Sequence, residues 1–175
     1  MNGETAKKAL LIKLVAMDVD GVLTDGKTYC QPDGSHIVAF DVHDGSGIKY
    51  LGRAGLQTAF ISGRDVRAVR HRAETLGVDE VVQGAKNKLP AYRDVRDAMG
   101  RDDEEVCYIG DDLTDLPVLR QVGLSAAVHD ARPELRREAD LVTDAPGGAG
   151  AVRELAEYIL KTQGEWVSII ERYRP

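Results

Sequence analysis

The sequence Lys-Leu-Val-Ala-Met-Asp-Val-Asp-Gly-Val-Leu-Thr-Asp at residues 13–25 decides the fold of this chain. Its apolar run leads directly into two aspartates, and short runs of this kind are typical of buried strands in a parallel sheet. Ligands of such sheets bind beyond the carboxyl ends of the strands, so Asp18 and Asp20 are expected to face a binding crevice. Two close carboxylates repel each other, and a hard divalent cation such as Mg²⁺ relieves that repulsion. The simpler alternative is a turn in which Asp20 has no chemical role.

Length and composition narrow the class of protein. The chain has 175 residues, of which 43% are hydrophobic, so residues 1–175 can form one domain with a real core. The net charge is −6 without a lysine- or arginine-rich block, which makes nucleic acid and anionic membranes poor partners. No apolar run is long enough to span a bilayer. Cys30 and Cys107 belong to no motif, which favours a reducing cytoplasm over a disulfide framework.

Strand-like and helix-like segments alternate along the rest of the chain. Buried strands are expected at residues 57–61, 106–109 and 124–128, with shorter ones at 80–82 and near residue 141. Helices are expected between them, one opening at Asp44 and another capped by Asp65. The polar residues 1–9 are expected to be frayed. This alternation predicts an α/β fold with a doubly wound, mostly parallel sheet.

A hairpin is expected directly after the Asp-x-Asp loop. Two β-rich runs flank a Pro-Asp-Gly turn, which predicts strand pairing within about residues 27–42. Its apolar side chains fall on both faces of the ribbon: Tyr29, Ile37, Val38, Phe40 and Val42. An isolated hairpin is marginal in water and exposed apolar faces are a liability, so we expect it to be buried against its counterparts in a homotetramer.

Four polar loops are expected to meet at the carboxyl edge of the sheet. They carry the residues Asp18, Asp20, Ser62, Gly63, Arg64, Lys88, Asp111, Asp112 and Asp115. Clustered carboxylates, a hydroxyl with free backbone N–H groups and an ammonium suit phosphoryl transfer, with a carboxylate as nucleophile. Each later loop alone has a simpler explanation: a helix-entry turn, a solvated surface lysine, or acids that cap a helix.

The order of these loops resembles that of the haloacid dehalogenase superfamily, whose phosphatases have Asp-x-Asp first, Ser or Thr second, Lys third and an acidic pair fourth. The resemblance is closer still to a branch without a full cap domain, the 3-deoxy-D-manno-octulosonate 8-phosphate phosphatases and their relatives that act on nonulosonate 9-phosphates. It covers nearly the whole chain and includes Asp-Val-Asp-Gly-Val-Leu-Thr-Asp-Gly at 18–26 and Tyr-Ile-Gly-Asp-Asp-Leu-Thr-Asp at 108–115. Members of this branch are tetramers in which neighbouring hairpins meet and help to cover the active sites.

The resemblance implies a Mg²⁺-dependent phosphatase with an aspartyl-phosphate intermediate. Asp18 would attack phosphorus, and Asp20 would protonate the leaving alcohol and then activate water. Mg²⁺ would be held by Asp18, the backbone carbonyl of Asp20 and Asp111. Ser62 and Lys88 would bind the phosphoryl oxygens.

Other residues are expected to support this chemistry. Asp112 and Asp115 resemble residues that orient the metal ligands and Lys88. The candidates for contact with the substrate are Gly63, Arg64, His43 and Asp44, together with Ser62.

Two positions depart from the family pattern. His43 stands where relatives commonly have Arg before Asp-Gly, and Ala149 stands where they commonly have Gly-Gly-Arg-Gly. Both arginines would suit a sugar-acid carboxylate, because a guanidinium binds it in bidentate fashion. The resemblance makes 3-deoxy-D-manno-octulosonate 8-phosphate the leading candidate substrate, and the two departures keep a nonulosonate 9-phosphate or another small phosphomonoester as alternatives.

Two alternative functions without phosphatase activity are less well supported by the sequence than the phosphatase. A receiver-type phospho-acceptor domain also uses an aspartate, an acidic pair and a lysine on a parallel sheet. Such domains lack an acid/base beside the nucleophile, so Asp20 followed by Gly21 argues against this class. A degenerate binding subunit is disfavoured because no core catalytic position is missing.

The tail, residues 164–175, contains the single tryptophan of the chain. Its apolar residues Trp166, Ile169, Ile170 and Tyr173 are spaced to share one face of a short helix, which would pack on its own subunit. The resemblance implies an alternative, in which the tail reaches a neighbouring active site and supplies an arginine there.

Overall fold

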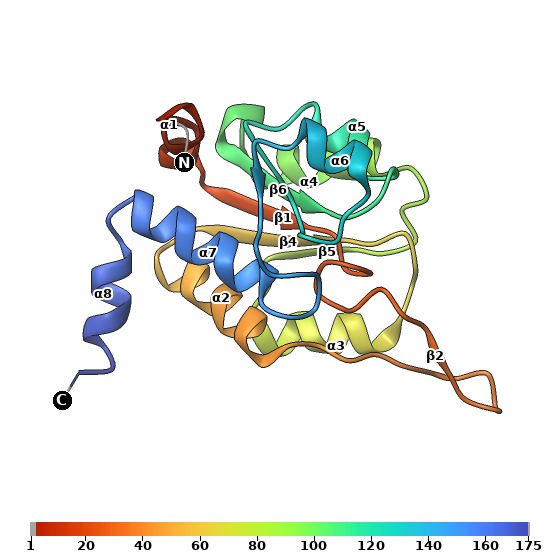
Figure 1. Ribbon diagram of the computed structural model, residues 1–175. Coiled ribbons are helices and arrows are strands. Elements are labelled where there is room, and N and C mark those ends of the chain that lie inside the picture. Colours follow the sequence, from red (N-terminus) through yellow and green to blue (C-terminus); the bar gives the residue numbers. More distant parts are fainter. Residues whose placement is uncertain (1–2, 175) are drawn as a thin grey trace.

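The centre of the protein is a six-stranded parallel sheet with the strand order β5-β4-β1-β6-β7-β8 (Figure 1). The computed structural model describes residues 3–174. The strands are β1 (Leu14–Met17), β4 (Gln57–Ile61), β5 (Glu80–Val82), β6 (Val106–Gly110), β7 (Leu124–Ala127) and β8 (Leu141–Val142). Every neighbouring pair is parallel, which confirms the α/β fold with a doubly wound sheet.

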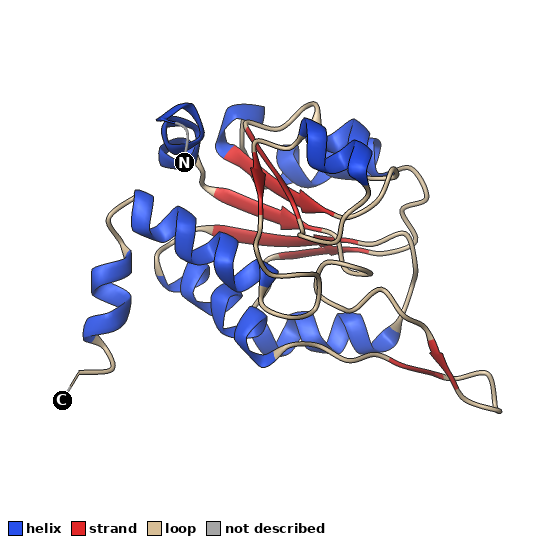
Figure 2. Ribbon diagram, in the orientation of Figure 1, coloured by secondary structure: helices blue, strands red, loops and turns tan. Residues whose placement is uncertain are grey.

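Helices cover both faces of this sheet (Figures 1 and 2). They are α1 (Gly3–Leu11), α2 (Val42–Arg53), α3 (Arg67–Leu76), α4 (Lys88–Ala98), α5 (Leu116–Leu119), α6 (Pro133–Glu138), α7 (Ala151–Thr162) and α8 (Trp166–Glu171). α2, α3 and α7 lie on one face, and α4, α5 and α6 on the other. Within residues 3–174 no helix combines the length and apolar character needed to cross a bilayer.

β1 is apolar because it is enclosed on all sides. Its four residues are buried, and it pairs with β4 on one edge and β6 on the other. The chain builds outward from β1 in both directions, so the strand order reverses there. Since the crevice of an open α/β sheet lies at this reversal, Asp18 is placed at the middle of the carboxyl edge.

The predicted hairpin follows β1 and projects away from the sheet (Figure 1). Its paired strands are short, with β2 (Tyr29–Cys30) antiparallel to β3 (His36–Ile37). Tyr29 and Ile37 are 44% and 56% exposed, whereas Val42, predicted as part of the hairpin, is the first residue of α2. The hairpin therefore has apolar surface that its own subunit does not cover.

Two helices begin at other residues than predicted. α2 starts at Val42, two residues before the predicted Asp44, because the Asp41 carboxylate caps its first turn. α3 starts after Val66, and Asp65 is not its cap. The backbone N–H of Val66 instead donates to Gln83 Oε1 at 2.8 Å, a tertiary contact that local sequence does not reveal.

Residues 3–11 form α1, so the prediction of a frayed end was wrong for residues 3–9; residues 1–2, which it also covered, lie outside the described residues. Thr5 and Ala9 are buried. Lys8 Nζ lies 2.5 Å from Asp140 Oδ1, and Gln163 Nε2 donates to the Ala9 carbonyl at 2.9 Å. A segment with few apolar residues is ordered here because distant parts of the chain supply its partners.

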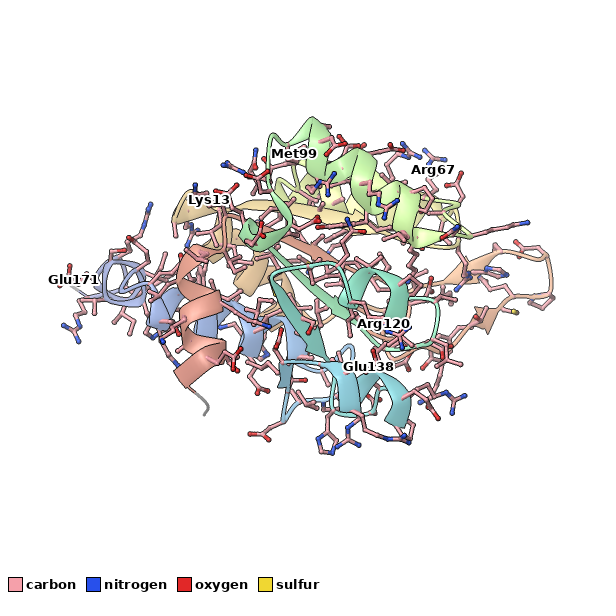
Figure 3. The ribbon with its side chains drawn as sticks, turned by 90° about the horizontal axis from the view of Figure 1, so that it is seen from above. Lys13, Arg67, Met99, Arg120, Glu138 and Glu171 are labelled. Atoms are coloured by element: carbon pink, nitrogen blue, oxygen red, sulfur yellow. The ribbon has the colours of Figure 1, made fainter. Side chains whose placement is uncertain are left out.

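The tail forms α8, with Ile169 buried and the Trp166 ring edge-on to Tyr50 at 5.9 Å between ring centroids. This confirms the short helix that packs on its own subunit. α8 and the hairpin lie at opposite ends of the molecule (Figure 1), and the label of Glu171 marks the α8 end in Figure 3. A contact between the tail and a neighbouring active site stays a prediction.

Candidate active site

The predicted polar loops follow the adjacent strands β4, β1 and β6, so their first residues lie side by side. Asp18 is 5% and Ser62 1% exposed, and Asp111 directly follows β6. Lys88 is the first residue of α4, after the N-cap Asn87, and is also 5% exposed. A lysine buried at that point must direct its amine inward. The strand ends and α4 therefore enclose one polar centre, as the sequence predicted.

Lys88 supplies the positive charge of this centre. Its Nζ lies 2.7 Å from Asp18 Oδ1 and 2.6 Å from Asp115 Oδ1. Burial favours the neutral amine, but the two carboxylates outweigh it, and the pKa of Lys88 is raised. The alternative of a solvated surface lysine is thereby excluded.

Three carboxylates surround this one ammonium. Asp18, Asp111 and Asp115 each have an oxygen within 4.8 Å of the others. Burial, with the charge of Asp115 added, raises the pKa of Asp18 well above its ordinary value and that of Asp111 to about 6. A cation among these oxygens would relieve the repulsion, and oxygen-only ligands fit a hard ion such as Mg²⁺.

Asp115 is fully buried, and both of its oxygens are occupied. Oδ1 accepts from Lys88 Nζ at 2.6 Å and from the Tyr108 hydroxyl at 2.7 Å. Oδ2 accepts from the backbone N–H groups of Asp111 and Asp112, at 3.0 and 3.2 Å. Asp115 thus orients the lysine and the acidic loop, whereas Asp112 donates its backbone N–H to Asp115 and accepts the backbone N–H of Leu113 with its own carboxylate.

Close backbone packing in this centre requires glycine. Gly21 has a φ of +93°, and a Cβ there would lie 2.1 Å from Asp111 Oδ2. A Cβ at Gly147 would lie 1.7 Å from the Gly21 carbonyl oxygen. The glycine of the Asp-x-Asp-Gly motif therefore leaves room for a carboxylate from another loop.

Asp20 lies at the rim, with its side chain 31% exposed. The Ser62 hydroxyl donates to Asp20 Oδ2 at 3.5 Å, and Arg64 Nη1 donates to Asp20 Oδ1 at 2.7 Å. Gly63, between these two residues, is exposed. Asp18, a buried carboxylate paired with lysine, can act as the nucleophile. Asp20, a solvent-accessible carboxyl group, can act as the proton donor.

Comparison with known proteins supports this chemistry. A model of haloacid dehalogenase-like hydrolases matches residues 40–123. The 3-deoxy-D-manno-octulosonate 8-phosphate phosphatase KdsC of Salmonella typhi is 45% identical over 158 residues, covering 90% of this chain and 84% of its own. The chain belongs to this phosphatase family of the haloacid dehalogenase-like hydrolases. It is therefore a phosphoric monoester hydrolase.

Solved structures place the phosphatase in the same family. The Yersinia pestis 3-deoxy-D-manno-octulosonate 8-phosphate phosphatase is 43% identical with a TM-score of 0.91, covering 93% of this chain and 88% of its own. The Moraxella catarrhalis enzyme, in complex with magnesium ion, phosphate ion and a KDO molecule, is 38% identical with a TM-score of 0.97. That match covers 99% of this chain and 100% of the other.

Two predicted substrate contacts of the phosphatase have partners other than the residues of the centre. The His43 side chain is 79% exposed, and its Nδ1 is 3.5 Å from Asp41 Oδ1. Asp44 is 1% exposed and accepts from the backbone N–H groups of Arg153 at 2.8 Å and Gly150 at 3.2 Å. The prediction for Asp44 was wrong, because its carboxylate joins α2 to the first turn of α7.

Two residues of the phosphatase were missed from the sequence. Tyr108 holds Asp115, and His36 Nδ1 lies 3.0 Å from Arg64 Nη2. A tyrosine inside a buried strand gave a weak signal for the first, since a buried hydroxyl needs a partner. His36 gave none, because it belongs to the hairpin and meets the site only after folding.

Proposed function

We propose that this phosphatase hydrolyses 3-deoxy-D-manno-octulosonate 8-phosphate, with Mg²⁺ and through an aspartyl-phosphate on Asp18. The observation that carries the proposal is the Asp18 carboxylate at the end of β1, bonded to Lys88 and close to Asp111. Relatives with this activity in their names, and the Moraxella catarrhalis complex, support the substrate and the metal.

The reaction has two steps. An Asp18 oxygen attacks phosphorus, the bond from phosphorus to the sugar oxygen breaks, and Asp20 gives its proton to that oxygen. Asp20 then takes a proton from water, whose oxygen attacks phosphorus and releases phosphate from Asp18. Attack requires the charged form of Asp18. Burial and the charge of Asp115 disfavour that form and raise the pKa, whereas the charge and the hydrogen bond of Lys88 favour it.

The phosphoryl group is held by this chain's polar groups. Ser62 would donate its hydroxyl and Lys88 its ammonium to phosphoryl oxygens. Asp18, Asp111 and the backbone carbonyl of Asp20 would hold Mg²⁺. When bound, the ion supplies positive charge that offsets the charge of the phosphoryl oxygens.

A nonulosonate 9-phosphate is the second candidate substrate. Exposed His43 and exposed Ala149 stand at the two positions where relatives commonly carry arginine. A guanidinium grips a carboxylate with two parallel hydrogen bonds, and neither residue can do so. Both candidate substrates are sugar acids, so these two positions bear on them alike, and a comparison of kcat/KM on the two substrates separates them.

A panel of sugar phosphates assayed with Mg²⁺ tests the assignment, with Asp18→Asn as the matched inactive control. The highest kcat/KM is expected for 3-deoxy-D-manno-octulosonate 8-phosphate. A higher value for a nonulosonate 9-phosphate would transfer the assignment to that substrate. Similar values for phosphates of neutral sugars would refute a sugar-acid phosphatase altogether.

Assembly and location complete the proposal. The exposed apolar residues of the hairpin support a homotetramer in which hairpins cover one another. Cys30 and Cys107 are free thiols, which supports the reducing environment of the cytoplasm.

A further inference from the structure

The Arg64 side chain lies between the catalytic loop and the hairpin. Nη1 donates to Asp20 Oδ1 at 2.7 Å, and Nη2 lies 3.0 Å from His36 Nδ1. Arg64 follows β4, whereas His36 opens β3, 28 residues earlier in the chain. Arg67, at the start of α3, marks the end of the molecule from which the hairpin extends (Figure 3). The Arg64 guanidinium thus connects the loop after β4, which carries Arg64 itself, with the Asp20 loop and with the hairpin.

The chemistry of the guanidinium fixes the direction of both contacts. Arginine is permanently charged and has five N–H donors and no acceptor. His36 Nδ1 must therefore accept, so the proton of the neutral ring is on Nε2. Asp20 Oδ1 also accepts, and a proton on that same oxygen would compete with the charged donor. Oδ2 accepts only from the neutral Ser62 hydroxyl, at 3.5 Å, and is therefore the better position for the proton of Asp20.

Oδ2 is also the oxygen that lies toward the reaction. The Ser62 hydroxyl is 3.5 Å from Oδ2, and Ser62 is the residue proposed to hold a phosphoryl oxygen. The Ser62 Oγ further accepts the backbone N–H of Arg64 at 3.1 Å, which ties the two residues to one turn. A proton on Oδ2 is consequently close to where the leaving oxygen of the substrate would be.

We propose that Arg64 is a positioning residue, held by His36 of the hairpin, which occupies Asp20 Oδ1 and so assigns proton transfer to Asp20 Oδ2. This inference rests on the proposed acid/base role of Asp20, and it does not depend on which sugar phosphate is the natural substrate. The hairpin then acts on catalysis directly, since His36 keeps the second arm of Arg64 away from the phosphoryl oxygens. An Arg64 that binds the substrate phosphate is the competing role.

The two roles differ in their dependence on the leaving group. An alkoxide needs the proton of Asp20 in order to depart, whereas p-nitrophenolate departs without one. A misplaced acid therefore lowers kcat/KM for an alkyl phosphate and spares p-nitrophenyl phosphate. A lost phosphate contact lowers kcat/KM for both substrates equally.

The experiment measures kcat/KM on both substrates for Arg64→Met, which keeps the length of the side chain but has no donor. The alkyl substrate is the sugar phosphate that the panel identifies. For Arg64→Met, kcat/KM on the alkyl phosphate should fall about 10- to 100-fold. On the aryl phosphate, kcat/KM should fall by a much smaller factor. Equal losses on the two substrates would overturn the proposal and assign Arg64 to phosphate binding.

Variants of His36 test whether the hairpin holds Arg64 in place. His36 is exposed, so it can be changed without loss of the fold. For His36→Ala, kcat/KM should fall about 3- to 10-fold on the alkyl phosphate alone, which is the effect expected from the loss of one hydrogen bond. His36→Asn should restore activity, because its Oδ1 can accept in place of Nδ1. The matched control is His71→Ala, an exposed histidine on α3. If His36→Ala matches this control, or if His36→Asn does not recover, the hairpin arm of the proposal is overturned.

Failure of the substrate assignment would give a different result. It appears as a changed order of wild-type rates across the panel, while the alkyl-to-aryl ratios of the variants are unaffected. Failure of the present inference appears in those ratios, while the wild-type order is unaffected.

Discussion

The buried centre around Lys88 and the exposed hairpin differ in whether their side chains find partners within one subunit. Lys88 and Asp115 are 5% and 0% exposed, and each has a partner of opposite charge in the same subunit. Ile37 and Tyr29 of the hairpin keep about half of their surface in solvent. The centre is thus completed by the folding of one chain, whereas the hairpin keeps apolar surface that its own subunit does not cover. Changes in the centre should affect chemistry and stability, and changes on the apolar faces of the hairpin should affect assembly.

The largest effect is expected from Asp18→Asn. A carboxamide does not attack phosphorus, so kcat should fall to background, measured in a preparation free of wild-type enzyme. The melting temperature should hold, because the change removes a like charge near Asp115 while Lys88 keeps that partner. Asp20→Asn is the matched control and should lose ~10²–10⁴-fold in kcat while still binding Mg²⁺. Wild-type kcat in Asp18→Asn would exclude it as the nucleophile.

Removal of the metal should show which acids of the centre are ligands. A ligand that binds only the folded state at 100 times its Kd stabilises that state by about 2.7 kcal/mol. Mg²⁺ should therefore raise the melting temperature of chelator-treated wild type, and restore its activity, but have little effect on Asp111→Asn. Asp112→Asn, in the same loop, should respond as the wild type does. A full response of Asp111→Asn to Mg²⁺ would remove Asp111 from the ligand set.

Asp115→Asn should destabilise the fold without removing the nucleophile. Its carboxylate accepts hydrogen bonds from Lys88, the Tyr108 hydroxyl and two backbone N–H groups, and the amide nitrogen of asparagine cannot accept any of them. Each buried donor left without a partner costs about 1–3 kcal/mol. The free energy of unfolding in urea is the measurement. Glu138→Gln breaks the exposed pair with Arg120, at 2.6 Å, and should change that free energy little. Equal effects of the two variants would mean that Asp115 has no special part in holding the centre together.

Ile37→Asp should have the smallest effect on the subunit and a clear effect on assembly. A charge on the exposed apolar face of the hairpin disfavours its burial against another copy, so light scattering should report a smaller mass than the tetramer expected for wild type. The unfolding of the subunit core should change little. Gln31→Asp, an exposed polar position on the same hairpin, should leave the assembly intact. A monomeric wild type at micromolar concentration would refute the tetramer itself.

The sequence by itself determined the sheet and the chemical identity of the site. A parallel sheet buried on both faces requires apolar strands, and these strands end in polar loops whose residues are readable in order. The positions of Asp18, Ser62 and Asp111 follow from this rule, because the ends of adjacent parallel strands are adjacent in space. The requirement for glycine at Gly21 is likewise marked in the local motif.

Only the tertiary structure decided which side chains face the site and which are held elsewhere. Asp44, predicted as a substrate contact, is buried against α7, and His36, which carried no motif, is hydrogen-bonded to Arg64. The N-terminal helix is anchored by residues more than a hundred positions away. Propensity and motif spacing report local conformation, whereas the direction and pairing of a polar side chain depend on segments that meet only after the chain has folded.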